Sequence, residues 1–279
     1  MPFFWKKHSY QTLNFFFNNK RMNQILFLGT GPSEGIKKKG KTGRMESSAL
    51  LETEKGNILI DLTNDFPIQG KKIKKINAIL ITHGHSDAIG GIPFFCHSEF
   101  ISESKILKQV QDDRTKNTLT FFAHPKTIEI IKRKFKNLES FYFQKIFPYK
   151  TFKIFNINIT PFPVKHSLQK GFPTFGFYFQ FPKTSFIYAS DVGSFDKKAE
   201  RLMQKADILI LDGAMWKQKM IAHLDITEIL PKICRWKNKK IIFTHIGKTA
   251  PDYKKLKLEI KKICPKALPA FDNMVLKFS

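Results

Sequence analysis

Short apolar runs separated by turns are the main pattern along this chain. Runs of roughly four to eight residues recur from one end to the other, punctuated by Gly, Pro, Lys and Asn, which is typical of β-strands joined by turns. The predicted strands are residues 24–31, 46–53, 56–63, 76–81, 119–124, 141–149, 151–164, 174–182, 184–191, 206–212, 241–245 and 271–278. Helical periodicity follows at residues 125–138 and 196–205. The pattern predicts an α/β (α+β) protein with strands in both halves.

Residue types that commonly bind metal ions come directly after one predicted strand. The apolar run 76–81 ends in the letters THGHSDAIGG, which place His83, His85 and Asp87 just past the strand. These side chains converge on one ion only if the backbone turns sharply, and Gly84 would allow that turn. His and Asp are ligands for zinc, manganese or iron. The alternative is a surface turn with two solvated histidines.

Further polar side chains come at the ends of later strands. His166, Asp191 and His245 each follow or end a predicted strand. An isolated histidine is more often structural than a ligand, so the interest of His166 lies in this shared position. Asp61 ends another strand and Asp65 follows it closely. By itself, a carboxylate at such a position is commonly the cap of a helix or turn.

The chain carries a formal charge of +25, which raises the question of a polyanionic partner. Of its 48 basic residues only six are arginine, and 29 phenylalanines accompany them. This composition favours a general bias of the source, because phosphate recognition usually prefers the bidentate fork of arginine. A polyanion-binding surface is the second interpretation. Nucleic acid is therefore a possible partner but not the favoured one.

The letters GIKKKGKT at residues 35–42 match those of a phosphate-binding P-loop. A P-loop opens a helix, and no apolar helical face follows these residues. The sequence therefore argues against nucleotide binding by a P-loop here.

Cysteine usage and hydropathy bear on the cellular compartment. The three cysteines, Cys96, Cys234 and Cys264, are odd in number, widely spaced and without a CxxC pair. They indicate a reducing compartment, hence a cytoplasmic protein, and no cysteine-based metal site. No apolar run reaches about 18 residues, so no transmembrane segment is expected.

Two segments differ from the rest of the chain. Residues 1–21 carry aromatic and positive residues without a signal-peptide core or cleavage site. Either the functional protein begins at Met22 and this extension is dispensable, or its FFF letters dock on the domain or a membrane surface. Residues 97–117 are polar and resemble the translated product of a mobile palindromic repeat. They predict a surface insert in which His97 is not a ligand.

The ordered elements resemble the metallo-β-lactamase superfamily. Residues 83–88 read HGHSDA, which is similar to its HxHxDH element except that Ala88 replaces the last histidine. The letters SDVG, HLDI, THIG and FDNM resemble its PhnP-like branch, the cyclic-phosphate phosphodiesterases of phosphonate breakdown and their relatives. The likeness covers residues 22–279 apart from the insert and implies a single domain. The implied fold is a four-layer αββα sandwich with ligands on loops at one edge.

The resemblance also implies a role for each site residue. The implied ligands of a first metal ion are His83, His85, His166 and Asp191, and those of a second are Asp87, Asp191 and His245. His223, in HLDI, would be catalytic, and Asp87 would orient the attacking water or take its proton. Asp61 would orient the metal-binding loop, as the alternative to a helix or turn cap. Two departures matter: Ala88 weakens the second site, and residues 31–44 lack the cysteines that hold a structural zinc in the best-known relative. Zinc is the expected metal, with manganese or iron as alternatives.

The function expected from this resemblance is metal-dependent hydrolysis of a small or cyclic phosphodiester. Metal-activated water would attack phosphorus while His223 protonates the leaving oxygen. The alternatives are a tRNA-processing type of nuclease, a lactonase or thioesterase, and a catalytically decayed member, for which Ala88 is the argument. A homodimer is left open.

Overall fold

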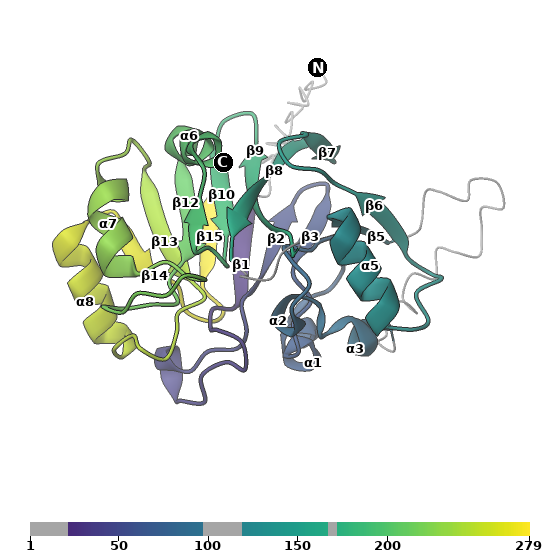
Figure 1. Ribbon diagram of the computed structural model, residues 1–279, viewed down its shortest axis with the longest axis horizontal. Helices are drawn as coiled ribbons and strands as arrows, with labels where there is room; N and C mark the ends of the chain where they lie inside the picture. Colours follow the sequence, from purple (N-terminus) through teal and green to yellow (C-terminus); the bar gives the residue numbers. More distant parts are fainter. Residues whose placement is uncertain (1–21, 97–118, 167–171) are drawn as a thin grey trace, which may run out of the picture.

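A computed structural model describes residues 22–96, 119–166 and 172–279 of the chain. Within these ranges two β-sheets pack face to face, and helices cover the outer face of each (Figure 1). The predicted four-layer αββα sandwich is therefore confirmed. The N-terminal extension 1–21 and the whole predicted insert 97–117, including His97, lie outside the described residues. No helix in the described part of the chain is long and apolar enough to cross a membrane.

The first sheet has seven strands in the order β15-β1-β2-β3-β4-β5-β6. Its strands are β1 (Asn23–Gly29), β2 (Ser48–Thr53), β3 (Gly56–Ile60), β4 (Ala78–Leu80), β5 (Thr120–Ala123), β6 (Tyr142–Lys145) and β15 (Val275–Phe278). As predicted, β2 and β3 form an antiparallel hairpin. β3, β4, β5 and β6 then run parallel, so that their carboxyl ends lie at one edge.

The second sheet has eight strands, with β11-β8-β9-β10-β12-β13-β14 in order and β7 paired to β8. Its strands are β7 (Phe152–Ile154), β8 (Ile157–Lys165), β9 (Thr174–Gln180), β10 (Ser185–Ala189), β11 (Ser194–Phe195), β12 (Ile208–Asp212), β13 (Lys240–Thr244) and β14 (Ala267–Pro269). β10, β12, β13 and β14 are parallel. This sheet therefore also gathers several carboxyl ends at one edge.

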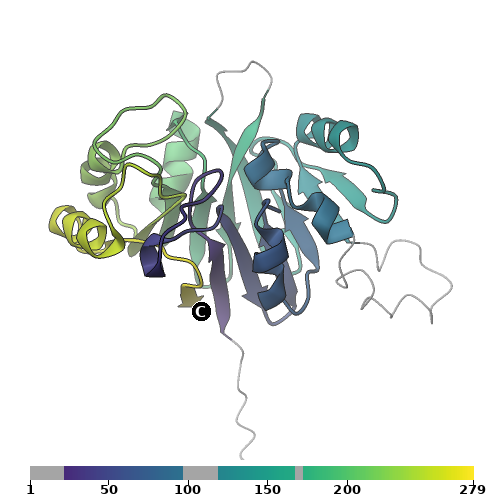
Figure 2. The ribbon, with the colours of Figure 1, turned by 90° about the horizontal axis from the view of Figure 1, so that it is seen from below.

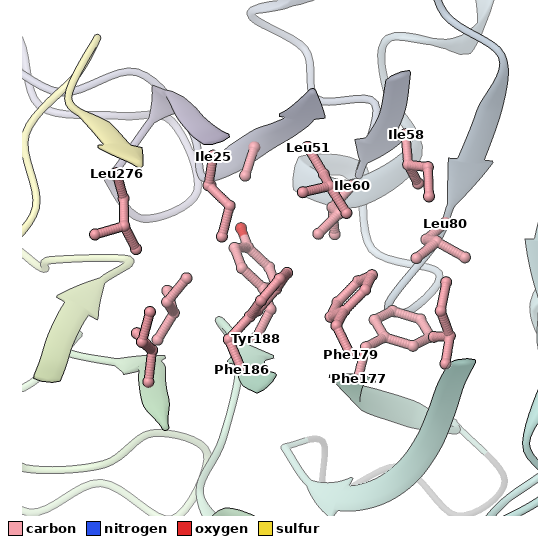
Figure 3. Packing of buried hydrophobic residues seen from close by; sticks show 14 of the residues in the cluster. Ile25, Leu51, Ile58, Ile60, Leu80, Phe177, Phe179, Phe186, Tyr188 and Leu276 are labelled. Carbon is pink, nitrogen blue, oxygen red and sulfur yellow. The ribbon is translucent and has the colours of Figure 1, made fainter. Parts of the chain in front are cut away.

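Strand periodicity explains how the layers form. Successive residues of a strand point to opposite faces, and Ile58 and Ile60 enter the core between the sheets while Leu59 packs under the helices of the first sheet. Likewise Phe177 and Phe179 enter the central core. Figure 3 shows these phenylalanines facing the aliphatic side chains of the first sheet. Burial of this apolar surface holds the sandwich together.

The helices cover the outer faces of the sheets. They are α1 (Phe66–Gln69), α2 (Ser86–Ile89), α3 (Ile92–Cys96), α5 (Pro125–Lys134), α6 (Lys197–Lys205), α7 (Ile226–Cys234) and α8 (Tyr253–Ile263), with 3-10 turns η1 (Gly40–Thr42) and η2 (Gly70–Lys72). The N-caps of α6, α7 and α8 are Asp196, Asp225 and Asp252, whose carboxylates accept backbone N–H groups. The predicted helix 125–138 ends at Lys134, because Phe135 is extended and Asn137 has a φ of 59°.

The structure pairs two of the cysteines that the sequence analysis treated as unpaired. Cys234 at the end of α7 and Cys264 just after α8 form a disulfide. Their 30-residue separation hides the pair in the sequence. Packing of α7 against α8 brings the two residues together.

Candidate metal centre

The predicted site residues gather at one edge of the sandwich. His83, His85 and Asp87 follow β4, His166 follows β8, Asp191 lies two residues past β10, and His245 follows β13. Donor atoms of His83, His85 and His166 all lie within 4.8 Å of one another, and those of His83, Asp87 and Asp191 do so as well. Residues far apart in the chain thus form one cluster of nitrogen and oxygen ligands.

Asp61 orients the loop that begins the cluster. It accepts the backbone N–H and the hydroxyl of Thr82, each at 2.8 Å. Because the Thr82 hydroxyl gives its proton to Asp61, it must accept one from Nδ1 of His83, 2.8 Å away. That tautomer leaves Nε2 of His83 free to bind a metal. The geometry therefore favours the orienting role of Asp61 over a turn cap.

Gly84 packs closely against neighbouring side chains and has an ordinary backbone conformation, not the special turn that the sequence suggested. Its φ does not lie in the left-handed region; a side chain there would place Cβ 2.9 Å from Ile130 Cδ1. The ring of Phe172 also lies close to Gly84 and stacks on His85, with centroids 4.2 Å apart. The glycine makes room for this packing around His85 and does not supply a special turn.

His85 and His166 face each other across the cluster. Nδ1 of His85 lies 3.2 Å from Nε2 of His166. The Nδ1–H of His166 donates to the carbonyl of Ala222 at 3.0 Å, which fixes the ring and turns Nε2 toward the cluster. Ala222 directly precedes His223 in the sequence. The hydrogen bond from His166 therefore connects the His166 side chain to the backbone beside His223.

Several buried polar atoms of the cluster have no hydrogen-bond partner among the described residues: Nε2 of His83, Oδ1 of Asp191, and both ring nitrogens of His245. Nε2 of His245 lies 3.0 Å from Asp191 Oδ1 and 3.7 Å from Asp87 Oδ2, yet the 3.0 Å approach lacks hydrogen-bond alignment. An unsatisfied buried polar atom costs about 1–3 kcal/mol. A divalent cation would satisfy these atoms, and the imidazole and carboxylate donors suit zinc, manganese or iron.

The cluster balances its charges internally. Burial alone would lower the pKa of His83, but the carboxylates of Asp191 and Asp87 raise it to about 9. Burial also works against protonation of His245, yet Asp191 raises its pKa well above the ordinary value. Burial opposes ionisation of Asp191, but His245 and His83 hold the pKa of its carboxyl well below the usual range. Protonated imidazoles thus supply, without metal, the positive charge that a bound cation would bring.

Two residues at the site have a backbone conformation that is uncommon outside glycine. Asp61 has a φ of 62° and His245 a φ of 53°. Such conformations cost about 1–3 kcal/mol and persist where the surroundings enforce them. Here the strain places one residue that orients His83 and one candidate ligand.

His223 and Asp212 form a second feature beside the cluster. Nδ1 of His223 donates to Oδ2 of Asp212 at 2.7 Å, and the His223 ring lies 4.8 Å from His166 and 5.0 Å from His245 between centroids. Asp212 is fully buried and also accepts the backbone N–H groups of Val192 and Ala214. Sequence analysis gave Asp212 no role. Its position at the end of β12, between the strands that lead to Asp191 and His245, was the available signal.

Other candidates lie away from the centre or contribute nothing to it. Ala88 is 1% exposed and lies on the buried side of α2, and its methyl group offers no ligand. The carboxylate of Asp65 accepts the backbone N–H of Glu46 and supports the neighbouring loop. His124 caps α5 through its ring nitrogen.

Comparison with known proteins agrees with this architecture. Residues 57–246, more than half of the chain, match the family described as "Beta-lactamase superfamily domain". None of the curated proteins compared with the chain matches it.

Among solved structures, a diphosphatase from the PhnP family is 24% identical, with a TM-score of 0.76 over 92% of this chain and 98% of that one. The metallo-β-lactamase fold protein YhfI from Bacillus subtilis is 14% identical, with a TM-score of 0.72 over 92% and 100%. The short form of human tRNase Z is 18% identical, with a TM-score of 0.65 over 91% and 98%. At these identities the likeness shows the fold. The family match, the shared fold and the histidine–aspartate cluster lead to one conclusion: the chain belongs to the metallo-β-lactamase superfamily.

Proposed function

We propose that the protein is a metal-dependent hydrolase of small phosphodiesters, of the PhnP-like branch. The observation that carries the proposal is the set of buried, unpartnered ligand atoms beside the hydrogen-bonded His223–Asp212 pair. The first part can hold a cation, and the second can move a proton next to it. Hydrolysis of a phosphodiester needs both, because charge develops on the phosphoryl oxygens while the leaving oxygen gains a proton.

The ligands assigned to a first metal are His83, His85, His166 and Asp191, and those assigned to a weaker second metal are Asp87, Asp191 and His245. A divalent cation held there supplies Lewis-acid charge that makes water reactive near neutral pH. Ala88 leaves the second site one ligand short, so more of the charge stabilisation falls on the side chains of the protein. Zinc is favoured for this donor set, with manganese or iron as alternatives.

We assign to His223 the donation of a proton to the leaving oxygen. Its Nδ1–H is committed to Asp212, so Nε2 is the nitrogen available to a substrate. The side chain is 16% exposed, which allows a bound substrate to reach it. Asp212 is the positioning residue: it fixes the ring and, held by two backbone N–H groups, cannot turn away.

We assign to Asp87 the orientation and deprotonation of the attacking water. Its carboxylate lies 3.5 Å from Nε2 of His83 and 3.7 Å from Nε2 of His245, and its side chain is 12% exposed. It is thus close to both sets of ligands and reachable from solvent. A carboxylate in that position can accept a hydrogen bond from water, orient it for attack and receive its proton.

The choice of phosphodiester over carboxylic ester draws support from the likeness to the PhnP-family diphosphatase and from the HLDI, THIG and FDNM letters. The test is to screen the zinc- and manganese-loaded protein with bis-p-nitrophenyl phosphate, nucleoside 2′,3′-cyclic phosphates and lactones. Metal-dependent turnover of the phosphodiesters is expected, and His85→Ala should abolish it. Turnover of lactones alone, or of none of these compounds, would refute the proposal.

A further inference from the structure

Hydrogen bonds to the rest of the protein orient three of the histidines at the metal centre. Their partners are a threonine hydroxyl, a backbone carbonyl and a buried carboxylate. His85 differs from these three: among the described residues, the one hydrogen-bonding contact of its ring joins Nδ1 to Nε2 of His166, 3.2 Å away. Two nitrogens that bind the same cation do not hydrogen-bond to each other, because each directs its lone pair at the metal. Hydrogen bonding therefore does not fix the His85 ring for metal binding.

A stacked aromatic ring holds the imidazole of His85 instead. The ring of Phe172 lies nearly parallel to it, with centroids 4.2 Å apart and an angle of 22° between the planes. The rings of His83 and His166 approach His85 edge-on, with centroids at 4.8 and 5.2 Å. In the described part of the chain, Phe172 is thus the one ring that stacks on a face of this imidazole.

Backbone contacts place Phe172 next to the loop that carries His85. Phe172 lies two residues before β9, and the N–H of Phe175 in β9 donates to the carbonyl of Thr82 at 2.9 Å. Thr82 lies three residues before His85, so this hydrogen bond joins the start of β9 to the ligand loop. Pro173 directly follows Phe172 and restricts the backbone of Phe172 to extended conformations. The position of the ring is therefore set by the chain around it.

The ring also packs over the backbone of the ligand loop. A Cβ on Gly84 would lie 3.4 Å from Cζ of Phe172 and 2.9 Å from Cδ1 of Ile130, a residue of α5. Figure 2 looks from below onto the edge of the sandwich where α1 and α2 lie in Figure 1, and His85 is the N-cap residue of α2. Phe172 thus covers the backbone before His85 as well as its imidazole.

Stacking suits this ligand because it covers a face of the ring and uses neither nitrogen. Nδ1 of His85 then stays available to a cation on the side of His166. His85 is only half-buried, so an imidazole without the stacked ring is free to turn toward solvent. A ligand that is already held in its bound orientation loses less conformational entropy when the metal binds. Stacked aromatic pairs change equilibrium constants by about two- to tenfold.

We propose that Phe172 is the positioning residue of His85: its ring holds the imidazole, by stacking, in the orientation that presents Nδ1 to a metal ion. This inference rests on the assignment of His85 as a ligand in the proposed function, and it does not depend on the substrate. Loss of the ring frees the imidazole and weakens metal binding, although Phe172 itself offers no ligand atom.

Titration with Co²⁺, whose visible absorption bands respond to ligand geometry, measures this role without any catalysis. Full-length protein is made metal-free with a chelator and titrated with Co²⁺ while the spectrum is recorded. Phe172→Leu should raise the Kd about two- to tenfold and alter the Co²⁺ bands, because His85 is held less firmly. The matched control, Phe143→Leu, removes a partly buried ring from the outer face of the first sheet and should behave like the wild type. A leucine variant at 172 with the Kd and the spectrum of the wild type would overturn the proposal.

A double-mutant cycle tests whether Phe172 acts through His85. His85→Ala alone should weaken Co²⁺ binding more than Phe172→Leu does. Adding Phe172→Leu to His85→Ala should then change the Kd by less than about twofold, since no imidazole is left for the ring to hold. A further loss equal to that in the wild-type background would refute the role of Phe172 alone. Unchanged Co²⁺ binding by His85→Ala would instead refute the ligand assignment within the proposed function.

Steady-state kinetics separate the positioning of a ligand from contact with the substrate. At saturating metal, Phe172→Leu should hydrolyse bis-p-nitrophenyl phosphate with a KM within about twofold of the wild-type value. The metal concentration that gives half-maximal activity should rise in parallel with the Kd for Co²⁺. A raised KM with unchanged metal affinity would overturn the proposal in favour of a substrate contact. Absence of turnover by the wild type would refute the proposed function, while the Co²⁺ titrations still test Phe172.

Discussion

The metal centre and the basic pocket, an open pocket lined by Lys37, Lys38, Arg44 and Lys248, lie at the same edge of the sandwich but are built in opposite ways. The centre is buried, and its own carboxylates and imidazoles balance each other while several ligand atoms have no partner. The pocket is open, and its cationic side chains outnumber the acidic ones that line it. In the centre, buried polar atoms without hydrogen-bond partners cost free energy. In the pocket, like charges held close together do so. A bound cation would satisfy the unpartnered atoms of the centre.

The difference also shows how each region holds its shape. Orientation in the centre comes from buried hydrogen bonds, such as the chain Asp61–Thr82–His83. Orientation in the pocket comes from a backbone hairpin resting on α8, with Arg44 as the one buried charge. Substitutions in the centre should therefore remove metal and activity together. Substitutions of the exposed lysines in the pocket should leave both the metal content and the fold intact.

The largest effect is expected from His85→Ala, which removes one candidate ligand from the metal centre and leaves the basic pocket unchanged. His85 and His166 face each other at 3.2 Å, so loss of one imidazole opens the ligand set. We expect less than about half an equivalent of metal and a loss of turnover of about 10³-fold or more. Elemental analysis and bis-p-nitrophenyl phosphate hydrolysis measure both. His124→Ala, a histidine outside the cluster, should keep metal and activity; parallel losses in this control would contradict the assignment.

A smaller effect is expected from Asp212→Asn, which separates proton transfer from metal binding. The amide keeps an oxygen for the backbone N–H groups but holds the His223 ring less firmly. We expect kcat to fall about 10- to 100-fold with KM and metal content unchanged. The control Asp207→Asn changes a carboxylate just before β12, far from the site. Loss of bound metal in the Asp212 variant would show that this residue belongs to the ligand network.

Metal affinity should rise with pH. Carboxylates raise the pKa of His83 to about 9, so its imidazole is protonated below that pH in the metal-free protein and must lose its proton to bind metal. Between about pH 6.5 and 8.5 the apparent Kd should fall about tenfold or more for each pH unit. His85, whose pKa burial lowers to about 4, adds no proton in this range. A Kd independent of pH in chelator competition would disprove this charge balance.

The smallest effect concerns the anchoring of the basic hairpin, which is formed by residues 37–43 between the paired residues Ile36 and Arg44. Lys41→Ala removes the ammonium that lies over the ring of Phe271, and the free energy of unfolding should fall by about 0.5–1 kcal/mol. Lys39→Ala removes the same charge from the hairpin without such a contact and should leave stability unchanged. Urea denaturation of both variants makes the comparison. Equal stability of the two would show that the hairpin is held by its backbone alone.

Much of the centre was predictable because it depends on local pattern. An apolar run followed at once by His83, His85 and Asp87 predicts ligands at a strand end, and later strand ends supply His166 and the others. The same alternation of apolar residues predicts strands with a buried face. The family resemblance then orders these pieces into two sheets, which the structure confirms.

Other features were hidden because they depend on contacts between distant residues. Asp212 looked like an ordinary strand end until the fold placed it 2.7 Å from His223. Cys234 and Cys264 are 30 residues apart, and only the packing of two helices pairs them.

The sequence by itself determined the strand pattern, the ligand types and the excess of lysine. Only the tertiary structure decided which of those lysines meet around a pocket, since Arg44 and Lys248 are distant in the chain and converge through the hairpin and the loop after β13. It also showed that Gly84 packs closely against Ile130 and does not adopt a left-handed backbone conformation. Periodicity is a property of neighbours along the chain. Charge convergence, tautomers and steric room are properties of neighbours in space.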